Sequence, residues 1–215
     1  MRSNFDKQLV VLNSQLTDMA ALAENAIDCA AEALIFFDKE KAKLAIEYDG
    51  EIDEMEKEIE RLCLLILLQQ QPVAKDLRQV SAALKMITDM ERIGDQARDI
   101  SEIILTSPQK IQITQEGNIA QMARATKKMI HDVVDSFVKA DIQLAQQIID
   151  FDDVIDNFYD NARRELIEEI QSGSERVEVA VDLLSISKYF ERIGDHATNI
   201  AEWVIFSLTG VHKSN

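Results

Sequence analysis

Glycine, proline and cysteine are all scarce in this 215-residue sequence, with six, two and two copies respectively. Few glycines and prolines leave few turns, so the elements between them have to be long. Those segments are rich in Ala, Leu, Ile, Glu, Lys and Gln, which favour helices, and none shows the sustained alternation of a strand. The sequence therefore predicts an all-α protein.

Other absences exclude several classes of protein. The longest apolar run, residues 62–68, is far shorter than the ~20 residues that a membrane-spanning helix needs, and the polar start of the chain lacks a signal-peptide core. Cys29 and Cys63 stand singly in apolar helical pattern, which favours buried thiols over a disulfide bond. No nucleotide-binding, nucleophile-elbow or zinc-protease motif occurs. We therefore expect a cytoplasmic protein that is not an enzyme and does not insert into a membrane.

Basic side chains are scarce relative to acidic ones. Acidic side chains outnumber basic ones by 39 to 23, which gives a net charge of −16. Such a surface repels nucleic acid and anionic lipid, and it attracts cations or basic protein partners. We therefore expect no nucleic-acid binding.

Turn residues divide the chain into six expected helices. These helices run from residue 5 to the turn at 36–38, from 38 to 70, from 73 to 105, from near 117 to near 140, from there to 172, and from 174 to near 209. Short connections make successive helices antiparallel neighbours in a bundle.

The second half of the sequence repeats the first. Residues 19–53 match residues 122–156 at an offset of 103, and residues 91–102 match 191–202 at an offset of 100, with eight of twelve residues identical. The change of offset falls in the loop near 69–75, where a structural repeat tolerates a length difference. The expected fold is therefore a tandem repeat of two antiparallel three-helix bundles, residues 1–109 and 110–215.

Acidic residues continue an apolar stripe on the third predicted helix. Residues four apart differ by only about 40° around a helix, so a stripe can be followed along the sequence. The stripe consists of Leu77, Val80, Leu84 and Ile87, and the acids on its azimuth are Glu91, Asp95, Asp99 and Glu102. Glu191 and Asp195 hold the equivalent places in the sixth helix.

Further acidic pairs stand at i and i+4 on the second and fifth predicted helices, Asp49 with Asp53 and Asp152 with Asp156. Several anions between packed helices are destabilising unless a cation neutralises them, and carboxylate oxygens bind hard metal ions. The alternative is a solvated acidic face. Because acidic pairs recur at equivalent places in both repeats, the pattern favours metal binding.

Two glycines interrupt these helices beside the acids. Gly94 and Gly194 fall mid-helix, where glycine costs about 1 kcal/mol relative to alanine. We expect a neighbouring helix to approach closely there. His196 matches Gln96 in the other repeat, so the pattern does not favour it as a ligand.

With these motifs placed, the chain closely resembles the PhoU family of phosphate-transport accessory and regulatory proteins. The resemblance covers the length, the tandem repeat and the doubled Glu-Arg-Ile-Gly-Asp motif with its upstream acidic pair. It implies transition-metal clusters, of iron first, with zinc, manganese or nickel as alternatives. The implied ligands are Asp49, Asp53, Glu91, Asp95 and Asp99 in the first repeat and Asp152, Asp156, Glu191 and Asp195 in the second. Asn199 replaces the acid found at Asp99, which implies a weaker second site.

The same resemblance implies a role. The family's members restrain phosphate uptake and phosphate-starvation signalling, as adaptors between the ATPase subunit of a phosphate ABC transporter and a sensor histidine kinase. A homodimer is left open. Two alternatives compete with this function: a metal-storage or carboxylate-bridged iron protein, disfavoured because no Glu-x-x-His pair occurs, and a purely structural bundle.

Overall fold

Six helices occupy the residues that the computed structural model describes, which are 2–70, 72, 75–107 and 110–211. They are α1 (Arg2–Phe36), α2 (Lys39–Gln70), α3 (Lys75–Thr106), α4 (Asn118–Lys139), α5 (Ile142–Gln171) and α6 (Val177–Thr209). No strand occurs in these ranges. The predicted all-α fold is confirmed, with helix ends within a few residues of expectation. The predicted start of the third helix at residue 73 lies outside the described residues.

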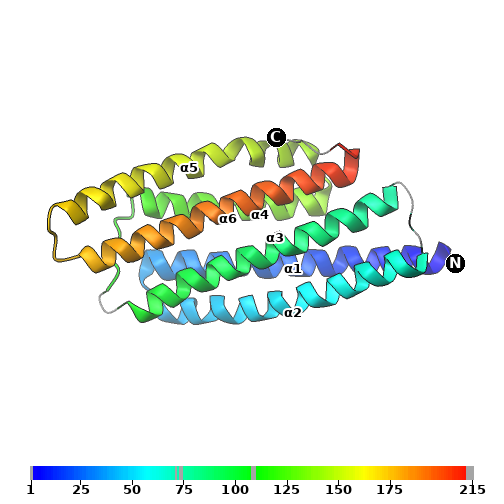
Figure 1. The fold of residues 1–215 in the computed structure, drawn as a ribbon, viewed down its shortest axis with the longest axis horizontal. Helices are drawn as coiled ribbons and strands as arrows, with labels where there is room; N and C mark the ends of the chain where they lie inside the picture. Colours follow the sequence, from blue (N-terminus) through cyan, green and yellow to red (C-terminus); the bar gives the residue numbers. More distant parts are fainter. Residues whose placement is uncertain (1, 71, 73–74, 108–109, 212–215) are drawn as a thin grey trace.

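The helices form two antiparallel three-helix bundles that lie side by side (Figure 1). One bundle contains α1, α2 and α3, and the other contains α4, α5 and α6. The bundles meet where α3 packs on α6 and α1 packs on α4. Within the described residues α2 and α5 contact only helices of their own bundle, so they form the outer edges of the molecule (Figure 1).

The turn between the first two helices has the same construction in both bundles. Phe37 and Ala140 adopt the left-handed conformation, with φ of 53° and 51°, which is uncommon for residues other than glycine. The carboxylate of the next residue, Asp38 or Asp141, accepts hydrogen bonds of 2.9–3.2 Å from two backbone N–H groups of the following helix. Each aspartate thus caps a helix N-terminus. The repeat therefore extends to the backbone conformation of its turns.

Aliphatic side chains fill both bundles. Val80 and Ile87 of the predicted α3 stripe are buried, whereas Leu77, at its start, is 43% exposed. Cys29 and Cys63 are buried and unpaired, as predicted, and burial raises the pKa of Cys63 to about 12. Such a thiol carries almost no thiolate at neutral pH, so Cys63 is a packing residue.

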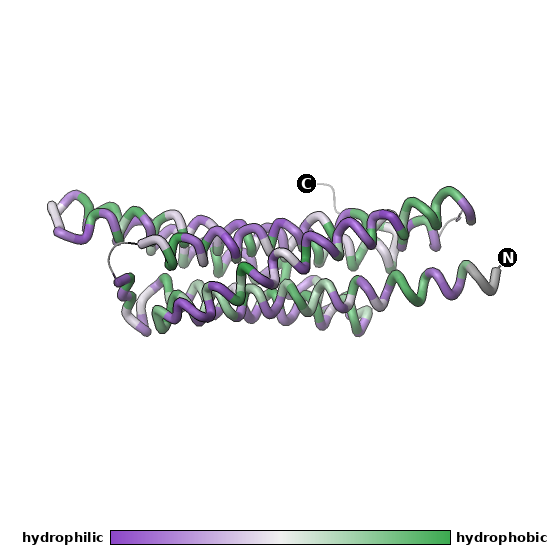
Figure 2. The backbone as a smooth tube through the Cα atoms, turned by 90° about the horizontal axis from the view of Figure 1, so that it is seen from below, coloured by the Kyte–Doolittle hydropathy of each residue, from purple (hydrophilic) through white to green (hydrophobic). Residues whose placement is uncertain are grey.

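Hydrophilic and hydrophobic residues alternate along the helices (Figure 2). This alternation is typical of amphipathic helices that bury one side against their neighbours. In the part of the chain that the structure describes, no helix is long and apolar enough to cross a membrane.

Candidate metal centres

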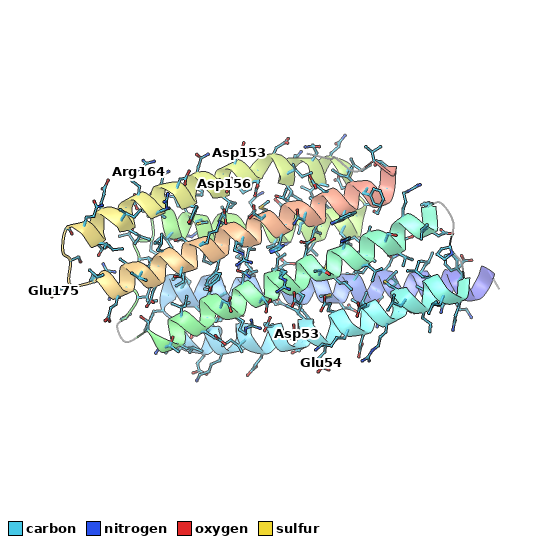
Figure 3. The ribbon with its side chains drawn as sticks, in the orientation of Figure 1. Asp53, Glu54, Asp153, Asp156, Arg164 and Glu175 are labelled. Atoms are coloured by element: carbon cyan, nitrogen blue, oxygen red, sulfur yellow. The ribbon has the colours of Figure 1, made fainter. Side chains whose placement is uncertain are left out.

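Each candidate centre lies between the outer helix and the third helix of one bundle. In Figure 3, Asp156 lies between α5 and α6, whereas Asp153 lies on the outer edge of α5. Asp53 holds the place on α2 that is equivalent to Asp156. The first centre is therefore built on α2 and α3, and the second on α5 and α6.

Two glycines allow the acids of the outer helices to approach α3 and α6. A Cβ atom added to Gly94 would lie 3.0 Å from Oδ1 of Asp49 and 3.1 Å from Cδ1 of Ile52. A Cβ atom added to Gly194 would lie 3.3 Å from Oδ1 of Asp152. The predicted close approach is confirmed in both repeats, and the glycines provide space for the first carboxylate of each pair.

We expect Gly94→Ala to destabilise the protein by about 1 to 2 kcal/mol, because the added methyl group overpacks the contact between α2 and α3. Gly50→Ala is the matched control, since nothing lies within 4 Å of a Cβ atom at that position. It should stabilise α2 by up to about 1 kcal/mol through helix propensity. Urea unfolding of both variants tests this pair, and equal stabilisation by both would show that Gly94 is not needed for the close approach.

An arginine occupies the middle of the first centre. Arg98 contacts Asp49 on α2 at 2.9 Å and Asp95 on its own helix at 2.7 Å, and it lies 3.5 Å from Asp99. Asp49 is 4% exposed and is the only buried charged residue among those described. Its Oδ1 atom is buried without a hydrogen-bond partner. The first centre therefore holds its deepest carboxylate against a permanent positive charge.

The remaining acids of the first centre surround this pair. Arg92 contacts Glu91 at 3.3 Å and Asp95 at 2.9 Å. Burial, then the Asp95 carboxylate, raises the pKa of Glu91, and Asp53 and Glu56 act in the same direction. The structure thus brings four predicted ligands together and adds Glu56. Glu56 was not among the predicted ligands, although its spacing from Asp53 places it on the same face of α2.

The second centre gathers the same kinds of acids around different cations. Burial raises the pKa of Asp152 to about 6, and the Asp156 and Asp195 carboxylates contribute. Burial, then the Glu191 carboxylate, raises the pKa of Asp156 and of Asp195. Lys188 forms an ion pair with Glu191. All four predicted ligands of the second repeat therefore act on one another electrostatically.

Positions 99 and 199 lie along the seam between the bundles. Burial, then the Asp99 carboxylate, raises the pKa of Tyr189 of α6, and the Asn199 amide donates to Asp89 of α3 at 3.1 Å. His196 also contacts Asp89, at 2.9 Å. Asp99 thus faces α6 as well as Arg98, and Asn199 faces the opposite bundle rather than the acids of its own.

The donor set fits a metal ion in its chemistry, although the side chains are not arranged around one. Among the described residues, no group of three or more His, Cys, Asp or Glu side chains is placed to hold an ion as it stands. The donors are carboxylates, which suit iron and manganese, and the buried Oδ1 atom of Asp49 lacks a partner. Positively charged side chains already lie among the acids. A metal would therefore bind by displacing them and reorienting the carboxylates.

Comparison with known proteins places the whole chain in one family. The PhoU domain model matches residues 16–104 and 119–204. A PhoU homologue of Clostridium acetobutylicum, named a phosphate-specific transport system accessory protein, is 36% identical over 97% of this chain and 96% of its own. A homologue of Thermotoga maritima with the same description is 34% identical over 96% of this chain and 90% of its own. The crystal structure of PhoU from Pseudomonas aeruginosa superposes with a TM-score of 0.89 at 31% identity, over 96% of this chain and all of that one. The chain, with two PhoU domains in tandem, belongs to the PhoU family.

Proposed function

We propose that this protein is a cytoplasmic, non-enzymatic negative regulator of phosphate uptake and of phosphate-starvation signalling. It acts as an adaptor between the ATPase subunit of a phosphate ABC transporter and a sensor histidine kinase. The observation that carries this proposal is the match, over nearly the full chain, to proteins named as accessory to phosphate-specific transport.

The architecture is compatible with an adaptor. Residues 1–109 and 110–215 are proposed as its two structural units, and each repeat presents a different outer helix, α2 or α5, away from the interface between bundles. The net charge of −16 favours basic surfaces on the partners. A transition metal, iron first, is proposed to bind carboxylates between the outer and third helices.

Deleting the gene should leave phosphate-responsive genes expressed even in phosphate-rich medium, because the restraint on the kinase is lost. A transcriptional reporter in wild-type, deletion and complemented strains measures this effect. Complementation controls for effects on neighbouring genes. Normal repression in the deletion strain at high phosphate would refute the regulatory role.

A further inference from the structure

The connection between the two repeats runs between the bundles at one end of the molecule (Figure 1). Its described part, residues 110–117, is called the linker below. Gln115 of the linker donates to the carbonyl group of Ile35, in the first bundle, at 3.3 Å. Arg176, in the second bundle, donates to the carbonyl group of Gln112 at 3.0 Å. The linker is therefore bonded to both bundles, and the space that it occupies is called the linker groove.

The linker fits this groove through alternate side chains. Ile111 is 1% exposed and Ile113 is half-buried, whereas Gln112 and Thr114 are exposed. This alternation is typical of an extended segment that places one face in a groove. The linker groove thus accepts an extended segment with aliphatic residues two positions apart.

The repeat gives the linker groove a twin at the opposite end of the molecule, because α3 and α6 run antiparallel (Figure 1). This second groove, called the open groove below, has a volume of about 320 Å³, within the range of ligand pockets. Three of its lining residues correspond, at offsets of 103 and 100, to residues beside the linker: Leu16 to Ile119, Ala83 to Leu183, and Ala140 to Phe37. Val211, which corresponds to Ile111, is 65% exposed. It therefore does not fill the open groove as Ile111 fills the linker groove.

The two grooves differ in charge. None of the described residues that line the open groove is acidic, and Lys75 is basic. Three of them correspond to acids at the other end: Asn13 to Glu116, Lys75 to Glu175, and Ala82 to Asp182. The linker beside those acids carries Lys110. In a chain with a net charge of −16, the open groove is therefore a place where an acidic segment meets little repulsion.

The open groove also offers polar groups to a peptide backbone. Nε2 of Gln79 donates to Oδ1 of Asn13 at 3.0 Å, which ties α3 to α1. This bond does not use Oε1 of Gln79 or Nδ2 of Asn13, which can accept from an N–H group and donate to a C=O group. Backbone hydrogen bonds of this kind hold extended peptides whatever their side chains.

We propose that the open groove docks an extended, acidic segment of a partner protein, in the way that the linker occupies the other end. The segment has aliphatic residues two positions apart, which cover the exposed side chains of Val138 and Leu208. The inference rests on the proposed adaptor function, to which it assigns one partner-binding surface.

Two fluorescein-labelled peptides test this assignment on the full-length protein by fluorescence anisotropy. One has the sequence of residues 110–116, and the other carries Glu in place of Lys110. The acidic peptide should bind the wild type about fivefold more tightly, because it meets Lys75 in a groove without acids. Val138→Glu should weaken its binding by about tenfold or more, because an apolar contact is lost and a like charge is added. Val10→Glu, at a 69% exposed position that does not line the groove, is the matched control and should bind as the wild type does.

Lys75→Glu tests the charge argument, because it introduces the residue that the second repeat has at position 175. This variant should prefer the peptide with Lys110, and circular dichroism confirms that every variant is folded. The inference is overturned if neither peptide binds the wild type at millimolar concentration, if Val138→Glu binds as tightly as Val10→Glu, or if Lys75→Glu keeps the wild-type preference. The adaptor function would survive any of these results, since the reporter strains test it separately. If ultracentrifugation shows a wild-type dimer that Val138→Glu dissociates, a second copy fills the groove and the assignment to an acidic partner is wrong.

Discussion

Replacing Arg98 with threonine should destabilise the chelator-treated protein by about 2 to 3 kcal/mol at pH 7, because removing one partner of a buried ion pair leaves an uncompensated charge. The charge left without a partner would be that of Asp49, which is 4% exposed, whereas Asp95 keeps its ion pair with Arg92. Urea unfolding followed by circular dichroism measures the change.

Arg92→Thr is the matched control. Arg92 also pairs with Asp95, but its side chain is 50% exposed, so its loss should cost less than about 1 kcal/mol. Equal losses for the two variants would mean that Arg98 is an ordinary surface partner. The reciprocal change, Thr198→Arg, should stabilise the metal-free protein, because it gives Asp152 and Asp195 a counter-ion.

Asp152→Asn should have opposite effects with and without metal. In the metal-free protein it should raise stability at pH 7 by about 1 to 2 kcal/mol, because one pKa unit corresponds to 1.36 kcal/mol and solvent screens part of the effect. Burial holds the pKa of Asp152 at about 6 in the folded protein. In the metal-loaded protein the same change removes a ligand, so the rise in melting temperature on adding metal should shrink. Thermal melts with chelator and with Mn²⁺ measure both effects.

The raised pKa of Asp152 also determines how the stability of the metal-free protein changes with pH. Between the ordinary pKa of an aspartate and about 6, the folded state binds more protons at Asp152 than the unfolded state, so stability falls as pH rises through that window. Asp152→Asn should flatten this fall. Glu175→Gln, in the exposed turn before α6 (Figure 3), is the control and should change neither the pH profile nor the metal response. A wild-type-like response in Asp152→Asn would contradict the placement of Asp152 in a metal site.

The helices and the repeat could be predicted because their signals are local. The scarcity of glycine and proline and the helical spacing of apolar residues predicted the helices. The offset of 103 predicted the repeat, which extends to the equivalent turns at Phe37 and Ala140. The acids on α2, α3, α5 and α6 could likewise be assigned to one face, because residues four apart share an azimuth. Gly94 and Gly194 predicted the close helix approach that the structure confirms.

The partners of those acids could not be predicted in the same way. Asp99 shares the azimuth of Asp95, but whether its carboxylate meets α2 or α6 depends on how the bundles pack, which periodicity does not specify. Arg92 and Arg98 neutralise Asp95 from both sides, and the contact of Arg98 was not predicted. The exchange of Arg98 for Thr198 was visible in the aligned repeats. The consequence of this exchange for the charge of the first centre depends on the distance from Arg98 to Asp49, which lies on another helix.

The metal content of the full-length protein, purified without chelator, tests the central claim most directly. Elemental analysis should find a transition metal, iron first, bound to the wild type and lost from the variant that carries Asp49→Asn, Asp95→Asn, Asp152→Asn and Asp195→Asn. If wild type contains no iron, manganese, zinc or nickel above the level in that variant, the acids of both repeats are a solvated face and not metal ligands.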